Sequence, residues 1–91
     1  MEEQEKTIAV EKFIVTDGKD RYNVMLELRK SGAFQYGNRT MMGMYINDKF
    51  HAAYDTRYDS WCNTPEKFHD GAPNFLKGYF DKRFKIRRVH K

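Results

Sequence analysis

The chain has one cysteine, two prolines and no long hydrophobic run among its 91 residues. The single cysteine, Cys62, excludes an internal disulfide framework. No apolar stretch approaches the roughly 20 residues that span a bilayer. The first six residues, MEEQEK, are acidic and polar where a secretory signal needs a basic flank followed by an apolar stretch. These absences predict a reducing, cytoplasmic setting and no contact with a membrane.

Ninety-one residues are enough for one hydrophobic core and too few for two domains. The chain is 40% hydrophobic and 15% aromatic, which is too apolar for a disordered protein although 33% of its residues are charged. We therefore expect a single folded domain over residues 1–91, in which the acidic residues 1–6 are frayed. A core of this size leaves little room for an enclosed active site.

Alternating apolar residues and β-branched residues predict two β-hairpins in the first part of the chain. Asn47-Asp48 divides the second hairpin, and this pair tolerates the positive φ angles of a tight turn. Met42 and Met44 are expected in the core. Residues 31–40 show no sustained period and are expected to form a loop or a broken strand. The four predicted strands cover residues 8–16, 21–29, 42–46 and 50–54.

A helix that covers the sheet is predicted over residues 65–81. Thr64 is the expected N-cap and Pro65 the first helical residue, and apolar residues then recur on one face of the helix. Pro73 lies inside this pattern, which predicts a kink or a second start with Asp70 as its N-cap. One bent helix and two short helices are both compatible with the pattern.

The last ten residues, 82–91, contain six Lys or Arg residues and no acid. Because the whole chain carries a net charge of +4, residues 1–81 carry −2. The basic character of the protein therefore belongs to this C-terminal segment alone.

The same segment alternates as a strand would, with Phe84 and Ile86 facing inward and Arg83, Lys85 and Arg87 facing outward. A helix that continues from the preceding one is the rival interpretation, because no Gly or Pro separates the two segments. We expect the strand. The predicted fold is therefore α+β, with an antiparallel sheet of four or five strands covered on one face by a kinked C-terminal helix.

Binding to nucleic acid, or to a complex that carries nucleic acid, is the first functional hypothesis. In a strand the outward cations would lie about 6.7 Å apart, a spacing that suits successive phosphates. A solvated charge run that protects an edge strand, next to an acidic N-terminus, is the structural alternative. The predicted nucleic-acid-binding residues are Arg83, Lys85, Arg87, Arg88 and Lys91.

The second hypothesis is a small protein-binding inhibitor or adaptor, of the kind that mobile elements and phages encode. It rests on the small size and on the surplus of aromatic residues in the middle third of the chain, because Tyr, Trp and Arg are the residue types of interface hot spots. The predicted partner-binding residues are Tyr36, Arg57, Tyr58 and Trp61.

Catalysis is not expected. Cys62 could pair with His51, His69 or His90 in a cysteine-dependent enzyme, but no spacing brings them together, and an inert thiol is the simpler interpretation. One cysteine and three scattered histidines lack the paired spacing of a zinc site. The sequence thus predicts a binding protein without a cofactor, a metal or a small-molecule substrate.

Overall fold

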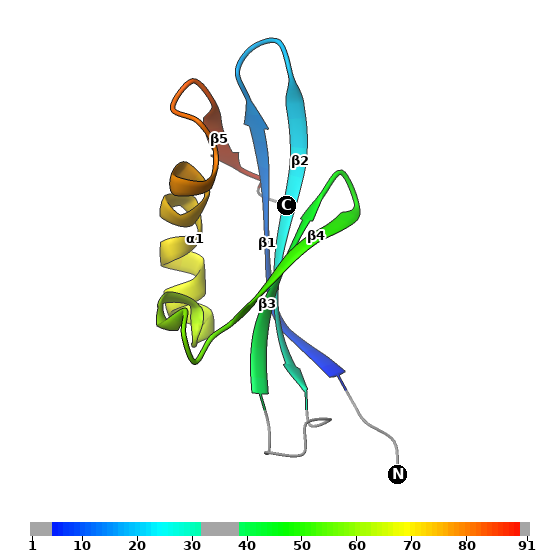
Figure 1. The fold of residues 1–91 in the computed structure, drawn as a ribbon, viewed down its shortest axis with the longest axis vertical. Helices are drawn as coiled ribbons and strands as arrows, with labels where there is room; N and C mark the ends of the chain where they lie inside the picture. Colours follow the sequence, from blue (N-terminus) through cyan, green and yellow to red (C-terminus); the bar gives the residue numbers. More distant parts are fainter. Residues whose placement is uncertain (1–4, 32–38, 90–91) are drawn as a thin grey trace.

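The structure is a computed structural model that describes residues 5–31 and 39–89. It is an open five-stranded antiparallel sheet with strand order β4-β3-β2-β1-β5, and one α-helix lies along one side of the sheet (Figure 1). The predicted α+β architecture is confirmed. Within the described residues no helix is both long enough and apolar enough to cross a membrane. The elements are β1 (Glu5–Thr16), β2 (Arg21–Ser31), β3 (Arg39–Ile46), β4 (Lys49–Asp55), η1 (Ser60–Cys62), α1 (Pro65–Tyr79) and β5 (Lys85–Arg88).

Both predicted hairpins are present, and local chemistry explains each turn. In the β1–β2 turn the Asp17 carboxylate accepts hydrogen bonds from the backbone N–H groups of Asp20 and Lys19, at 2.7 and 2.9 Å. These bonds lower the pKa of Asp17 below its ordinary value. In the β3–β4 turn Asn47 and Asp48 have φ angles of 52° and 68°, the left-handed conformation that this type of tight turn requires.

The strands of the first hairpin are longer than the sequence predicts. β1 begins at Glu5 and pairs residues 5 and 6 with residues 31 and 30 of β2, so these two residues are not frayed as predicted. Residues 31–40 were expected to form a loop or a broken strand; the loop alternative is wrong at its ends, because residue 31 belongs to β2 and residues 39 and 40 belong to β3. The part of this range between these strands, 32–38, lies outside the described residues.

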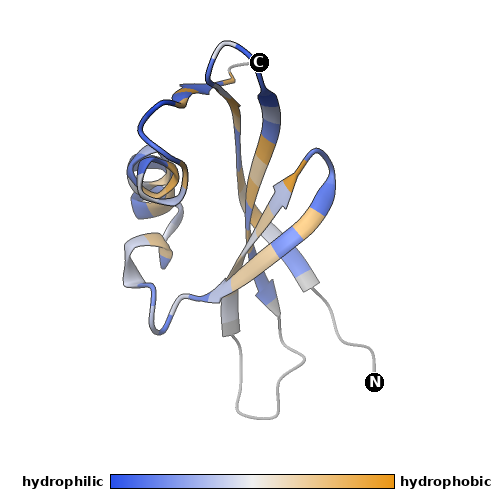
Figure 2. Cartoon of the chain, turned by 45° about the horizontal axis from the view of Figure 1, so that its top comes forward, coloured by the Kyte–Doolittle hydropathy of each residue, from blue (hydrophilic) through white to orange (hydrophobic). Residues whose placement is uncertain are grey.

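The core lies between α1 and one face of the sheet. Apolar and hydrophilic residues alternate along the strands (Figure 2), and the register shifts at two irregularities, one between Thr7 and Ala9 of β1 and one between Met44 and Tyr45 of β3. The predicted core residues Met42 and Met44 are fully buried. The other buried apolar residues are Phe13, Val15, Val24, Leu26, Leu28, Cys62, Phe68, Ala72 and Leu76.

Helix α1 is one continuous helix of 15 residues. Thr64 is the N-cap as predicted, and its side chain accepts a hydrogen bond from the backbone N–H of Lys67 at 3.2 Å. The helix continues through Pro73, so the alternative of a second start capped by Asp70 is wrong. Gly71 lets the Trp61 ring pack closely against the helix, since a Cβ atom at this position would lie 2.7 Å from the ring.

The C-terminal segment forms a strand, as predicted, but a short one. β5 covers four residues and pairs with the end of β1, Phe13–Thr16. Phe84 and Ile86 pack against the core, which confirms the predicted inward face. Arg83 precedes the strand in a turn and is therefore not part of the predicted stripe within one strand.

Candidate functional site

Charged and aromatic side chains lie side by side on the sheet face opposite α1. We call this face the open face, because α1, the one α-helix of the described chain, packs on the other face. The pairing registers place Phe50, Tyr45, Met25 and Lys12 side by side across β4, β3, β2 and β1. Four strand spacings separate β4 from β5, which is about 19 Å. The open face therefore joins an aromatic end to a basic end.

The basic end of the open face is a shallow groove with a volume of about 360 Å³, which we call the basic groove. Arg21 of β2 pairs with Thr16 of β1, which in turn pairs with Lys85 of β5, and Ile14 pairs with Arg87. These five residues line the groove, so its lining holds three cations and no carboxylate. In the part of the chain that the structure describes, none of the three cations forms an ion pair.

The aromatic end of the open face is formed by Tyr45 and Phe50. Their ring centroids lie 5.6 Å apart in an edge-to-face arrangement, and Phe50 is 61% exposed. The Tyr45 ring lies over Gly43, where a Cβ atom would be only 3.3 Å from it. The absence of a side chain at Gly43 thus lets Tyr45 lie close to the sheet. The exposed Phe50 ring and the half-buried Tyr45 ring offer stacking surfaces.

Lys85 and Arg87 are the predicted nucleic-acid-binding residues that reach the open face, and both are exposed. Arg83 lies in the turn before β5, where its Nε contacts the Asp17 carboxylate at 3.4 Å and its guanidinium lies over the Phe84 ring. Lys91 lies outside the described residues. The structure therefore brings two of the five predicted residues together.

Arg88 points to the opposite side of the sheet from Arg87 and closes the end of the core. Pro73 has no N–H to donate to the His69 carbonyl four residues earlier. Arg88 supplies the missing donor, because its Nη2 donates to that carbonyl at 2.8 Å. Its Nη1 also binds the Glu11 carboxylate, which accepts at 2.9 Å from His69 Nδ1. Arg88 is thus engaged within the fold, and we leave it out of the candidate site.

Of the predicted partner-binding residues that the structure describes, Arg57 and Tyr58 lie together. Trp61 packs against α1, with its ring stacked on Phe75 at 5.1 Å and on Phe68 at 6.4 Å. Tyr58 is 81% exposed in the turn after β4. Tyr36 lies outside the described residues. Arg57 adjoins Tyr58, with its guanidinium 5.6 Å from the centre of the Tyr58 ring.

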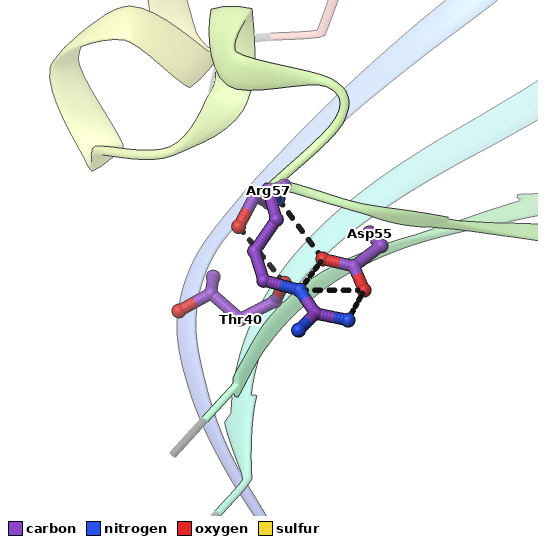
Figure 3. Close-up of polar contacts among 4 residues, drawn as sticks. Thr40, Asp55 and Arg57 are labelled. Atoms are coloured by element: carbon purple, nitrogen blue, oxygen red, sulfur yellow. Dashed lines mark hydrogen bonds and ion pairs between the residues drawn. The ribbon is translucent and has the colours of Figure 1, made fainter. Parts of the chain in front are cut away.

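The turn that carries Tyr58 is held by polar contacts with β3 and β4. Asp55 accepts hydrogen bonds from the backbone N–H of Arg57 and from its guanidinium, and Thr56 donates to the Thr40 carbonyl at 2.9 Å (Figure 3). The bond to Asp55 raises the pKa of Arg57 above its ordinary value. Tyr58 is therefore an exposed ring on an ordered turn.

Cys62 is buried beneath α1, and its Sγ donates to the Asp59 carbonyl at 3.2 Å. Burial raises the pKa of the Cys62 thiol to about 11. Because the thiolate is the reactive form, this environment disfavours nucleophilic chemistry at neutral pH. His69 and His51 are bound instead to Glu11 and to the Tyr79 hydroxyl.

Arg21, Lys12, Tyr45 and Phe50 are the residues of the open face that sequence reasoning did not place there. One signal could have placed Arg21. This residue lies two positions before Asn23 in β2, so both residues share a face, and this is the face opposite the buried residues of the strand. The alternation of residues along β2 could not show that β5 would place Lys85 and Arg87 beside Arg21. That arrangement depends on which edge of the sheet receives the C-terminal segment.

Comparison of the chain with protein-family models, with curated proteins and with solved structures finds no match.

Proposed function

We propose that the open face binds single-stranded nucleic acid. The observation that carries the proposal is the basic groove, in which Arg21, Lys85 and Arg87 converge without a carboxylate in the lining. Guanidinium groups bind phosphate oxygens, and the release of counterions drives the association. Tyr45 and Phe50 lie on the same face and offer rings on which unpaired bases stack. Stacking needs exposed base faces, which a duplex does not offer along its length.

The test is a titration of a labelled single-stranded oligonucleotide of about ten nucleotides, followed by fluorescence anisotropy at several salt concentrations. Affinity is expected to fall steeply with salt. The double variant Lys85→Ala, Arg87→Ala removes two phosphate contacts and should lower the slope of log K against log salt by about 1.4. Tyr45→Ala should weaken binding about tenfold or more through lost stacking.

The matched control is the double variant Lys67→Ala, Lys77→Ala, which removes the same charge from the exposed side of α1. It should change the salt slope by less than about 0.3. Equal losses in both double variants would reduce the effect to net charge and would contradict the proposed interface. Equal affinity for a duplex, with no effect of Tyr45→Ala, would contradict the single-stranded part.

A protein partner is the second candidate, and the exposed Tyr58 on its ordered turn favours it. A rigid aromatic ring beside an arginine is typical of an interface hot spot. Affinity purification after nuclease treatment tests this candidate. A protein retained by the wild type and lost with Tyr58→Ala would support it, and a protein retained equally by both would contradict a role for this turn.

A further inference from the structure

A second concavity lies between the C-terminal end of α1 and the β3–β4 hairpin. It has a volume of about 620 Å³, and we call it the aromatic groove. The groove is lined by five aromatic residues, one aliphatic residue and three basic residues, and by no carboxylate.

The rings of the aromatic groove support one another. Tyr22, Phe80 and Phe84 form a mutual cluster with centroid separations of 5.7–6.2 Å. Across from them, the His51 ring nitrogen is hydrogen-bonded to the Tyr79 hydroxyl, and this bond ties β4 to the end of α1. The groove is therefore bounded by rings whose positions are fixed by packing on one side and by a hydrogen bond on the other.

Lys49 is the cation of the aromatic groove that is available to bind an anion, because Arg83 is already paired with two aspartates. Lys49 forms no ion pair among the described residues, and Arg83 contacts Asp17 at 3.4 Å and Asp81 at 4.0 Å. A ligand that suits the groove is therefore a flat ring that carries a negative group. A nucleotide has both parts, since its base stacks on aromatic rings and its phosphate binds a lysine.

Phe50 connects the aromatic groove to the open face. It lines the groove and also contacts Tyr45 on the open face, at the edge strand β4. A strand that crosses from Lys85 toward Tyr45 leaves the sheet at Phe50, at the mouth of the groove. The geometry points to a subsite for one unpaired nucleotide of the bound strand, in the aromatic groove beyond edge strand β4. This inference rests on the proposed function and extends the same interface.

The test compares single-stranded oligonucleotides of about four and about ten nucleotides, because the shorter one spans little more than the open face. Lys49→Ala is the main variant, and it leaves the core untouched. Lys82→Ala is its control, an exposed lysine outside the groove lining. Phe84→Leu removes one ring of the groove and keeps an apolar side chain, with folding checked by circular dichroism.

If the subsite exists, Lys49→Ala and Phe84→Leu should each weaken binding of the longer oligonucleotide about three- to tenfold. The same variants should weaken binding of the shorter oligonucleotide less than about twofold. Lys82→Ala should change neither affinity. NMR signals of the His51 ring should shift with the longer oligonucleotide alone.

Two results would overturn the inference, and they are distinguishable. If Lys49→Ala and Phe84→Leu leave the longer oligonucleotide unaffected while the variant Lys85→Ala, Arg87→Ala weakens both, the strand ends on the open face and the proposed function stands. If the wild type binds neither oligonucleotide at low salt, the proposed function fails and the subsite fails with it.

Discussion

The two faces of the sheet differ in what their side chains contact. On the covered face, Leu26 and its neighbours are fully buried against α1. On the open face, Met25, which directly precedes Leu26 in β2, is only half-buried and lies beside Tyr45. Every second residue of one strand therefore contributes to the core, and the residues between them are available for binding. The position of a residue along its strand decides on which face it lies. The presence or absence of α1 on that face decides whether the residue is part of the core.

Arg87 and Arg88 show this difference in two consecutive residues of β5. Arg88 lies on the covered face, where its side chain is 18% exposed and is bound to Glu11 and to the His69 carbonyl. Arg87 lies on the open face and lines the basic groove. Two residues of the same type thus have separate roles, one in stability and one in the proposed interface.

The largest expected difference between the faces is in the two neighbours on β2. Leu26→Ala should lower the free energy of unfolding by about 3–4 kcal/mol, because it leaves a cavity in the core. Met25→Ala on the open face should cost about 1 kcal/mol or less. Urea denaturation of both variants measures the difference. Equal losses would mean that the open face is covered in solution.

The arginine pair gives the next largest effect. Arg88→Ala should lower the free energy of unfolding by about 2–3 kcal/mol, because Glu11 loses its ion pair with Arg88 and the His69 carbonyl loses its donor. Arg87→Ala should stay within about 0.5 kcal/mol of the wild type. Oligonucleotide affinity should rank the other way, with the loss at Arg87→Ala. A variant pair that loses stability and affinity in parallel would contradict separate roles.

A double-mutant cycle sharpens the role of Arg88. Pro73→Ala restores a backbone N–H that can donate to the His69 carbonyl. In that background Arg88→Ala should cost about 1 kcal/mol less than in the wild type. Additive losses would show that the bond to the carbonyl contributes nothing beyond the Glu11 contact.

Two glycines of α1 give a smaller effect with opposite signs. Gly78→Ala should raise the free energy of unfolding by about 0.5–1 kcal/mol, because a Cβ there meets nothing within 4 Å and alanine favours the helix. Gly71→Ala should lower it by about 1 kcal/mol, since the new Cβ would lie 2.7 Å from the Trp61 ring. Thermal denaturation distinguishes them, and stabilisation by both substitutions would contradict the packing of Trp61 on Gly71.

Cys62, which is fully buried, should be protected from chemical modification in the folded protein. Its pKa is raised to about 11, so the thiolate forms only as the pH rises well above neutrality. The folded protein should react with a thiol reagent at pH 7.5 at least about tenfold more slowly than the urea-unfolded protein. A folded-state rate equal to the unfolded one would show that Cys62 is exposed.

Much of the fold follows from local patterns in the sequence. Asn47-Asp48 predicts a turn because few residues accept a positive φ, and Thr64-Pro65 predicts a helix start because both suit its first turn. The alternative of a second helix start at Asp70 is wrong for a reason that lies elsewhere in the chain. The missing N–H of Pro73 is compensated by Arg88, which no local pattern shows.

The candidate site was predictable only in part. Alternation along β5 placed Lys85 and Arg87 outward correctly, because side chains in a strand alternate whatever the strand pairs with. It could not add Arg21, which is more than sixty positions away in sequence, or the ring of Tyr45. These residues meet because the chain returns to pair β5 with β1 at the edge of the sheet.

The sequence by itself determined the class of fold, the hairpin turns, the helix cap and the concentration of positive charge in the last ten residues. Each of these depends on neighbours within a few positions of the chain. The tertiary structure decided which of those charges are available. It assigned Arg88 to the covered face, where it is bound to Glu11 and the His69 carbonyl, and Arg87 to the open face, and it brought Lys85 and Arg87 beside Arg21. The reason is that strand order and helix placement depend on contacts between distant segments, which no local pattern encodes.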